Sequence, residues 1–215
     1  MTLPPRDASR TIREICAMAP IVPVLTIHDT RHAEPLAEAL IAGGLPALEV
    51  TLRTPAALEA IRAMAGISGG RVGAGTLITP DDVRAAKQAG ATFGVSPGAT
   101  GELLAACEAE NLPLLPGAAT ASEAMALLAR GYDMLKFFPA ETSGGAPALR
   151  AIGAPLPQIG FCPTGGVNPD NAQSYLSLAN VICAGGSWIA PPDLIAARNW
   201  SEIEDRARAA ARLSA

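Results

Sequence analysis

The stretch Ala47-Leu-Glu-Val-Thr-Leu52, followed by the segment Pro55–Ala65, decides the fold class of this 215-residue chain. The first stretch has the length and apolar character of a buried strand, and apolar residues recur in the second with helical spacing. Strands that are apolar throughout are typical of parallel sheets covered on both faces. The two segments therefore predict one strand-helix unit of a parallel α/β fold.

Units of the same kind recur along the chain at intervals of roughly twenty to twenty-five residues. The strand-like runs are Ile21–Ile27, Ala47–Leu52, Arg71–Thr76, Phe93–Pro97, Leu112–Gly117, Met134–Pro139, Ile159–Gly166 and Val181–Trp188. The helix-like segments between them are His32–Ala42, Pro55–Ala65, Pro80–Ala89, Thr100–Glu110, Ser122–Ala129 and Pro169–Leu178. A terminal amphipathic helix is expected at Ser201–Leu213.

Eight such units predict a (β/α)8 TIM barrel, a closed ring of parallel strands inside a ring of helices. An extra N-terminal helix near Ala8–Ala19 would cover the floor of the barrel. No linker or change in composition divides the chain, so residues 1–215 are expected to form a single domain. An open doubly wound sheet is the alternative, but the first strand-helix turn lacks its GxGxxG fingerprint.

Residues that begin and end helices occur at the expected places. A capping side chain precedes a proline at Thr54, Thr79 and Asn168, which predicts three helix starts. Glycine follows three helical segments, at Gly43, Gly90 and Gly131, where a left-handed C-terminal position is expected.

The composition excludes several classes of protein. Apolar residues make up 49% of the chain and charged residues 17%, with a net charge of −4, so a large core is expected and disorder is not. No basic patch or run of aromatic residues suggests nucleic-acid binding. The longest uncharged stretch, Asn171–Pro192, contains amides, glycines and prolines, and residues 1–20 contain no continuous apolar segment. Neither a membrane span nor a secretion signal is therefore expected.

The four cysteines are Cys16, Cys107, Cys162 and Cys183, and none of them forms a CxxC pair. Their wide spacing and apolar neighbours indicate buried thiols in a reducing compartment, which favours the cytoplasm. The two histidines, His28 and His32, have no partners at metal-ligand spacing, so no metal site is expected.

Lys136 is the first candidate for catalysis. Only Lys87 and Lys136 are lysines among the sixteen basic residues, so a lysine within an apolar strand is unusual in this chain. Alternation along the strand places Met134, Lys136 and Phe138 on one face, which we expect to point into the barrel. Desolvation favours the neutral form of an amine, and a neutral amine can form an imine with a carbonyl compound. The alternative is a lysine that reaches water or pairs with a carboxylate.

Glu49 and Arg53 are candidates on a second strand. Glu49 shares a strand face with Thr51 and Arg53, and an inward carboxylate could transfer protons during imine chemistry. A structural ion pair with Arg53 or Lys136 is the alternative for Glu49. Arg53 could bind the carboxylate of a 2-oxo acid through two parallel hydrogen bonds, or it could be an ordinary surface residue.

Two glycine-rich strand ends suggest a phosphate site. They are Pro163-Thr-Gly-Gly-Val-Asn168 after the seventh strand and Ala184-Gly-Gly-Ser-Trp188 after the eighth. Glycine lets backbone N–H groups approach an anion closely, and phosphate sites recur at the seventh and eighth loops of such barrels. A single Gly-Gly pair would also be explained by a tight turn, but two in consecutive units point to a phosphorylated substrate.

These motifs resemble the 2-keto-3-deoxy-6-phosphogluconate (KDPG) and 4-hydroxy-2-oxoglutarate (KHG) aldolases, class I enzymes that form a Schiff base. Matching segments run in order through nearly the whole chain: Val22-Pro-Val, Ala42-Gly-Gly, Leu48-Glu-Val-Thr-Leu-Arg-Thr54, Val72-Gly-Ala-Gly-Thr76, Ser96-Pro-Gly98, Leu115-Pro-Gly117, Lys136-Phe-Phe-Pro-Ala140, Phe161-Cys-Pro-Thr-Gly-Gly166 and Gly185-Gly-Ser-Trp188. The resemblance implies a lyase of the Entner-Doudoroff pathway that releases pyruvate. It also implies a homotrimer that needs no metal or organic cofactor.

The resemblance further implies a role for each site residue. Lys136 would form the Schiff base and Glu49 would act as acid and base. The substrate would contact Arg53 and Thr76 at its carboxylate, Pro97 and Phe138 around the pocket, and Thr164. The phosphate would contact Gly165, Gly166, Gly185, Gly186 and Ser187.

Two other functions remain compatible with the residue pattern alone. A phosphosugar isomerase or synthase could use the same phosphate site without forming an imine. A phosphosugar-binding barrel without catalytic activity could also use it. If the chain is an aldolase, the sequence leaves open its activity on KDPG relative to its activity on 4-hydroxy-2-oxoglutarate.

Overall fold

The structure is a computed structural model that describes residues 2–213, in which helices and strands alternate along the chain. The strands are β1 (Ile21–Leu25), β2 (Ala47–Thr51), β3 (Arg71–Gly75), β4 (Phe93–Val95), β5 (Leu114–Leu115), β6 (Gly117–Ala118), β7 (Met134–Phe137), β8 (Gly160–Pro163) and β9 (Ala184–Gly186). The helices are α1 (Pro5–Cys16), the 3-10 turn η1 (Thr30–His32), α2 (Ala33–Ala42), α3 (Ala57–Ala65), α4 (Pro80–Gln88), α5 (Gly101–Ala109), α6 (Ala121–Arg130), α7 (Gly145–Gly153), α8 (Ala172–Leu176), α9 (Pro192–Ala196) and α10 (Trp200–Ala210).

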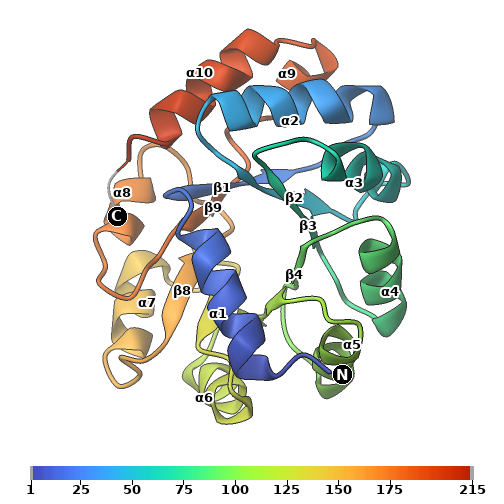
Figure 1. Cartoon of the computed structure of the whole chain (residues 1–215). Coiled ribbons are helices and arrows are strands. Elements are labelled where there is room, and N and C mark those ends of the chain that lie inside the picture. Colours follow the sequence, from blue (N-terminus) through green and yellow to red (C-terminus); the bar gives the residue numbers. More distant parts are fainter. Residues whose placement is uncertain (1, 214–215) are drawn as a thin grey trace.

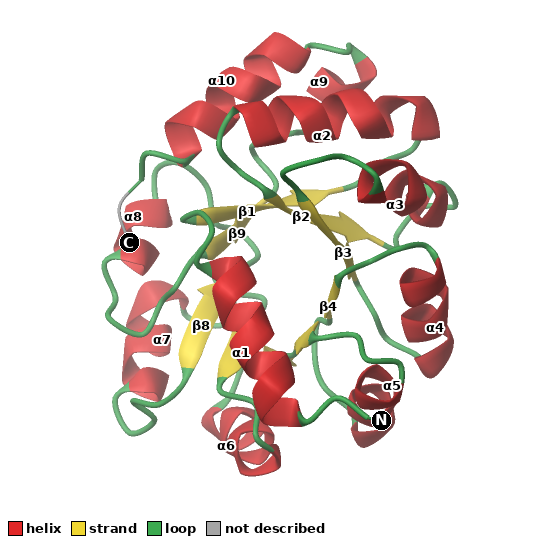
Figure 2. Ribbon diagram, viewed as in Figure 1, coloured by secondary structure: helices red, strands yellow, loops and turns green. Residues whose placement is uncertain are grey.

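The chain adopts an α/β fold with a curled sheet of parallel strands. One sheet has the order β5-β4-β3-β2-β1-β9 and a second has the order β6-β7-β8, and every pairing between named strands is parallel. The strands curl around a common centre, and the helices other than α1 lie outside them (Figures 1 and 2). Because all strands run the same way, their carboxyl ends collect at one end of the molecule.

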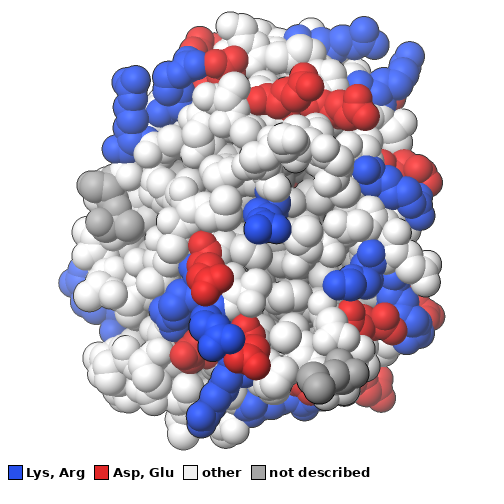
Figure 3. Space-filling model, viewed as in Figure 1, with Lys and Arg blue, Asp and Glu red and all other residues white. Residues whose placement is uncertain are grey.

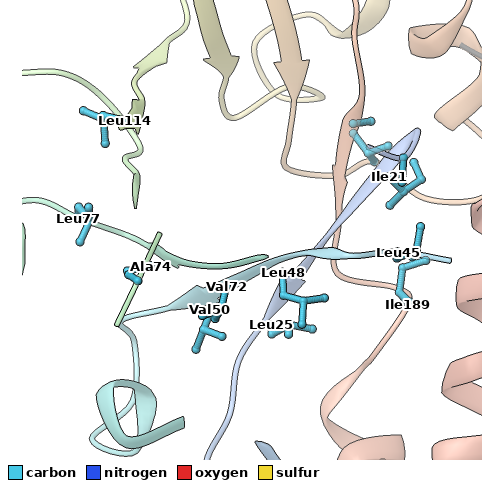
Figure 4. Packing of buried hydrophobic residues seen from close by; sticks show 14 of the residues in the cluster. Ile21, Leu25, Leu45, Leu48, Val50, Val72, Ala74, Leu77, Leu114 and Ile189 are labelled. Carbon is cyan, nitrogen blue, oxygen red and sulfur yellow. The ribbon is translucent and has the colours of Figure 1, made fainter. Parts of the chain in front are cut away.

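Each strand separates two apolar layers. The outer layer packs the strands against the helices and contains Leu25, Leu48 and Val50, which are almost completely buried (Figure 4). A second buried cluster, the inner layer, contains Phe93 and Met134. Burial on both sides explains why β1, β2, β7 and β8 are buried at every position.

Helix α1 lies across the amino ends of the strands (Figure 1) and contributes Ile12, Ile15 and Cys16 to the inner layer. Ser9 anchors this helix because its Oγ accepts from the N–H groups of Asp133 and Met134, each at 2.9 Å, and donates to the Asp133 carboxylate. The helix therefore covers the end of the molecule opposite the carboxyl ends of the strands.

The structure corrects several predicted boundaries. Thr79 caps α4 in a full capping box, but Thr54 instead donates to the carbonyl of Ile27, and α3 begins only at Ala57. The side chain of Asn168 accepts from Asp170 N at 2.9 Å in a local turn before α8, so it is not a helix cap. The prolines at these two positions belong to the connecting loops.

The glycine prediction was correct at Gly90 and Gly131, which both have positive φ angles. It was wrong at Gly43, whose φ is −74°, because the left-handed position falls one residue later at Gly44, with a φ of 91°. A side chain at Gly43 would collide with Ala207 of α10, so close packing explains this glycine. Helices α7 and α9 were not predicted, and Pro116 divides the predicted fifth strand into β5 and β6.

Charged side chains of both signs lie near one another on the face shown in Figure 3. Several form local pairs along helices, such as Arg206 with Glu202 at 2.8 Å and Arg10 with Asp7 at 2.8 Å. Within residues 2–213, no helix is both long enough and apolar enough to cross a membrane.

Candidate active site

A pocket with a volume of about 250 Å3 opens at the carboxyl ends of the strands. Its walls are formed by Val24, Glu49, Thr51, Arg53, Thr76, Pro97, Lys136, Phe138, Thr164, Gly165, Gly166, Val167, Gly185 and Ser187. Every residue that the sequence nominated for the site lines this pocket except Gly186. The pocket therefore brings together residues from strands that lie far apart in the sequence.

Lys136 and Glu49 face one another inside the pocket. Lys136 lies on β7 and Glu49 on β2, and Lys136 Nζ donates to Glu49 Oε1 at 3.2 Å. The two residues are 6% and 3% exposed, so the ion pair is largely removed from water. Of the two structural partners considered for Glu49, the structure selects Lys136 and not Arg53.

The strand alternation predicted around Lys136 is confirmed. Leu135 and Phe137 pack in the outer layer, whereas Met134 lies in the inner layer and both Lys136 and Phe138 line the pocket. The Lys136 Nζ atom lies 5.3 Å from the centre of the Phe138 ring. An aromatic face beside the amine limits its contact with water and still tolerates a positive charge there.

Two glycines of β3 make room for this arrangement, and the sequence reasoning did not explain them. A Cβ atom on Gly75 would lie 2.3 Å from Glu49 Oε1, and one on Gly73 would lie 2.4 Å from the ring of Phe93. The glutamate can lie along the neighbouring strand only because position 75 has no side chain. A glycine within a strand indicates close approach of another group, and that signal was present in the sequence.

Arg53 and Thr76 lie at the rim of the pocket. Arg53 is exposed, so its charged group can meet a ligand that enters from solvent. Thr76 has a φ of 64°, a left-handed conformation that is unfavourable for a β-branched residue. Such strain is concentrated at functional sites, where the surrounding structure maintains it. Thr51 was not nominated as a site residue, and its hydroxyl donates to the carbonyl of Leu25 at 2.9 Å.

The turn after β8 forms another wall of the pocket. Gly165 and Gly166 have φ angles of 99° and 82°, which side chains rarely adopt. Within residues 2–213, the N–H groups of Gly166 and Val167 donate no hydrogen bond to another residue, whereas Gly165 N–H faces the carbonyl of Gly185 across a parallel bridge. Successive unpaired N–H groups in such a turn suit an anion.

Gly185 and Ser187 line the same wall of the pocket. They lie there because Thr164 pairs with Gly185, which brings the two glycine-rich segments together. A Cβ on Gly185 would lie 2.3 Å from Thr164 Oγ1, so the absence of a side chain permits this approach. Gly186 does not line the pocket, and a Cβ there would meet the ring of Trp188. The need for glycine at position 186 is therefore explained by packing.

The chemistry available in this pocket follows from its three parts. A buried amine beside a carboxylate can exchange a proton and attack a carbonyl carbon. The exposed guanidinium at one side and the unpaired N–H groups at another side both favour a ligand with two anionic ends. Among the described residues, no group of three or more His, Cys, Asp or Glu side chains could hold a metal ion.

Comparison with known proteins identifies relatives along almost the whole chain. Residues 12–206 match the model of the family described as KDPG and KHG aldolase. A 2-dehydro-3-deoxy-phosphogluconate aldolase of Pseudoalteromonas atlantica is 49% identical, over 92% of this chain and 93% of the relative. A KHG/KDPG aldolase of Escherichia coli is 46% identical, over 91% of this chain and 92% of the relative.

Solved structures agree with the sequence relatives. A KDPG aldolase of Legionella pneumophila, determined with pyruvate captured as a covalent carbinolamine intermediate, superimposes with a TM-score of 0.90 and 47% identity. The match covers 93% of this chain and 97% of that chain. A Zymomonas mobilis KDPG aldolase with 3-phosphoglycerate also gives a TM-score of 0.90, at 44% identity over 96% of this chain and 97% of that chain.

Proposed function

The chain belongs to the KDPG and KHG aldolase family, and we propose that it cleaves 2-dehydro-3-deoxy-6-phosphogluconate to pyruvate and D-glyceraldehyde 3-phosphate. It is a carbon–carbon lyase of the class I type, and the reaction belongs to the Entner-Doudoroff pathway. The observation that carries the proposal is the buried pair of Lys136 and Glu49 in a pocket whose wall also contains an anion-suited turn.

The first half of the proposed mechanism forms an imine. Glu49 accepts a proton from the Lys136 ammonium, and the neutral Nζ attacks C2 of the 2-oxo acid to give a carbinolamine. Glu49 then returns a proton to the carbinolamine hydroxyl, water leaves, and the C2–N bond becomes an iminium. The 3.2 Å separation between Nζ and Oε1 allows the first transfer, from the ammonium to the carboxylate, without large movement of either side chain.

The second half breaks the carbon–carbon bond. Glu49, left as a carboxylate when water departed, accepts the C4 hydroxyl proton directly or through a water, and C4 becomes the aldehyde carbon. The C3–C4 electron pair moves into the iminium to give an enamine. Release of glyceraldehyde 3-phosphate is followed by protonation of C3 by Glu49 or a water that it orients. Hydrolysis of the imine then frees pyruvate and regenerates the amine of Lys136.

The remaining lining residues would orient the substrate. Arg53 and Thr76 would bind the carboxylate, and Pro97, Phe138 and Thr164 would enclose the reacting carbons. Gly165, Gly166, Gly185 and Ser187 would receive the phosphate, with Gly186 supporting that wall from behind. Cleavage of 4-hydroxy-2-oxoglutarate to pyruvate and glyoxylate would use the same amine without the phosphate contacts.

Reductive trapping tests the imine directly. The protein is incubated with pyruvate and sodium borohydride, digested, and mapped by mass spectrometry for the reduced pyruvate adduct. We expect the adduct on Lys136, and its loss in Lys136→Met. Lys87 is the internal control, because it is exposed and donates to the carbonyl of Asn111 at 2.9 Å, outside the pocket. Equal labelling of Lys87, or an unlabelled Lys136, would refute the mechanism.

We also propose that the two sheets form one closed (β/α)8 barrel in a single domain of residues 1–215, with α1 as its floor. Two observations support closure: only Pro116 separates β5 from β6, and two isolated bridges, Phe161 with Val181 and Thr164 with Gly185, join β8 to the segment of β9. A cytoplasmic homotrimer completes the proposal. Its support is the family resemblance, and sedimentation analysis measures its stoichiometry.

A further inference from the structure

The turn at Gly165 and Gly166 has a pocket on one side and a glutamate on the other. Both glycines line the pocket, whereas Glu141 lines a separate groove on the outer surface. A Cβ atom on Gly166 would lie 2.5 Å from Cγ and 2.7 Å from Cβ of Glu141. The aliphatic part of Glu141 therefore packs directly against the back of the turn.

The backbone around Glu141 extends this contact. Glu141 N donates to the carbonyl of Gly165 at 3.0 Å, and Ala140 N donates to the carbonyl of Thr164 at 2.8 Å. These two bonds align the segment after β7 with the turn after β8. A change in the conformation of Glu141 would thus be transmitted to the backbone of the turn.

Tyr175 of α8 fixes the side chain of Glu141. Tyr175 is 0% exposed, and its hydroxyl donates to Glu141 Oε1. Burial raises the pKa of Tyr175, and the bond to the glutamate acts in the same direction, so the phenol remains a donor. Glu141 is itself exposed, and an exposed glutamate without a partner would adopt several rotamers.

The segment that leads into α8 also holds the turn through its carbonyl. Asn171 Nδ2 donates to the carbonyl of Gly166 at 3.0 Å, and Asn168 Nδ2 donates to the same oxygen at 3.3 Å. The turn is therefore held at its carbonyl by two amides and at its Cα by the Glu141 side chain. This support leaves the N–H groups of Gly166 and Val167 without a hydrogen-bond partner among the described residues.

We propose that Glu141 and Tyr175 are positioning residues that hold the turn at Gly165 and Gly166 in its phosphate-binding shape. The pair thereby sets the preference for phosphorylated over unphosphorylated substrates, although neither side chain touches the substrate. This inference rests on the proposed aldolase function, because it assigns a specificity role within that same site. Preorganised donors bind an anion more tightly than donors that must first be ordered.

The test compares Tyr175→Phe with a matched control, Tyr132→Phe. Tyr132 is also 0% exposed, and its hydroxyl donates to the carboxylate of Glu108 at 3.2 Å, so both variants lose the same kind of bond. Tyr132 precedes β7 and therefore lies at the opposite end of the strand from the pocket. Cleavage is followed with KDPG and with 4-hydroxy-2-oxoglutarate through lactate dehydrogenase and NADH.

For Tyr175→Phe we expect KM for KDPG to rise about fivefold to tenfold, which corresponds to the net contribution of one typical hydrogen bond. The kcat for KDPG and both constants for 4-hydroxy-2-oxoglutarate should stay within about twofold of the parent values, because the amine and its carboxylate are untouched. Tyr132→Phe should leave both substrates unchanged. Glu141→Ala should reproduce the KDPG effect, and adding Tyr175→Phe to it should change KM no further, because the two residues act as one unit.

An equal effect of Tyr175→Phe and Tyr132→Phe on KDPG would overturn the inference. An equal loss of activity of Tyr175→Phe on both substrates would also overturn it, because that result would indicate a general structural role. Failure of the proposed function gives a different result, since the parent protein would then cleave neither substrate. A parent protein with the same KM for both would instead show that the turn does not bind phosphate.

Discussion

At the scale of single residues, the ion pair of Lys136 and Glu49 is both the reactive centre of the proposed mechanism and a source of instability. Removing two charges from water is unfavourable, and their mutual attraction offsets that penalty only partly. The pair is less than one-tenth exposed at each residue, so neither charge has bulk water as an alternative partner. Loss of either residue alone should therefore leave the charge of the other buried without a partner.

Lys136→Met should lower the free energy of unfolding by about 3 kcal/mol, because Glu49 then has no cation beside it. The double variant Lys136→Met with Glu49→Gln should recover most of that loss, since no isolated charge remains in the pocket. Urea denaturation followed by circular dichroism measures both values. Single and double variants of equal stability would mean that Glu49 does not depend on Lys136 in the folded protein.

The sequence predicted the members of this pair but not their contact. Lys136 was conspicuous because lysine is rare in this chain and because it lies in an apolar strand. Glu49 was conspicuous for the same apolar surroundings, yet two structural partners remained open for it. Lys136 and Glu49 are 87 positions apart in the sequence. Whether Glu49 contacts Lys136 or Arg53 therefore depends on how the strands pack, which local sequence patterns do not encode.

At the scale of elements, β3 determines where the carboxylate of Glu49 lies. The strand contains two glycines at alternate positions, and both face side chains from neighbouring strands. Residues two apart on a strand point to the same face, so Gly73 and Gly75 leave room on one face of β3 for the side chains of Phe93 and Glu49. Strand β3 therefore provides space for the catalytic groups but no functional group of its own.

Gly75→Ala should displace the Glu49 carboxylate, because the new Cβ would lie 2.3 Å from its Oε1. We expect kcat for KDPG to fall on the order of 100-fold, the effect of misplacing a catalytic group by about 1 Å. The matched control is Gly66→Ala, where a Cβ would meet nothing within 4 Å and the φ angle is −85°. Turnover of Gly75→Ala within about twofold of the control would contradict this role.

Element boundaries show which local signals were reliable. Thr79 capped α4 as predicted, and the structure adds a capping box, in which the Thr79 hydroxyl accepts from Asp82 N–H and the Asp82 carboxylate accepts from Thr79 N–H. Thr54 did not cap a helix, because it donates instead to the carbonyl of Ile27 in the loop after β1. Tertiary hydrogen bonds override local capping preferences, and only the structure reveals them. Helix α7 was missed because it begins in a stretch rich in glycine, alanine and proline, which resembles a loop.

At the scale of the whole molecule, the fold brings together residues that sequence spacing kept apart. The order of eight strand-like runs was sufficient to predict a parallel α/β fold, because each run is apolar on both faces. The three cysteines Cys16, Cys162 and Cys183 looked unrelated, yet they meet in the inner apolar layer beneath the pocket. No local pattern could pair them, since they come from the end of α1, from β8 and from the approach to β9.

All four cysteines are free and buried, which predicts a thiol reactivity set by unfolding of the molecule. Burial raises the pKa of the Cys107 thiol to about 12, so its reactive thiolate is scarce at pH 8 as well as inaccessible. Ellman's reagent should therefore label less than one thiol per native chain within minutes, and four after denaturation in guanidinium chloride. Ser122→Cys is the positive control, because residue 122 is exposed on α6 and should react at once.

Urea at concentrations below the unfolding transition should accelerate the slow labelling of all four thiols together if they are exposed by global opening. Rapid labelling of one native cysteine would show that its element opens alone, and peptide mapping would identify that element.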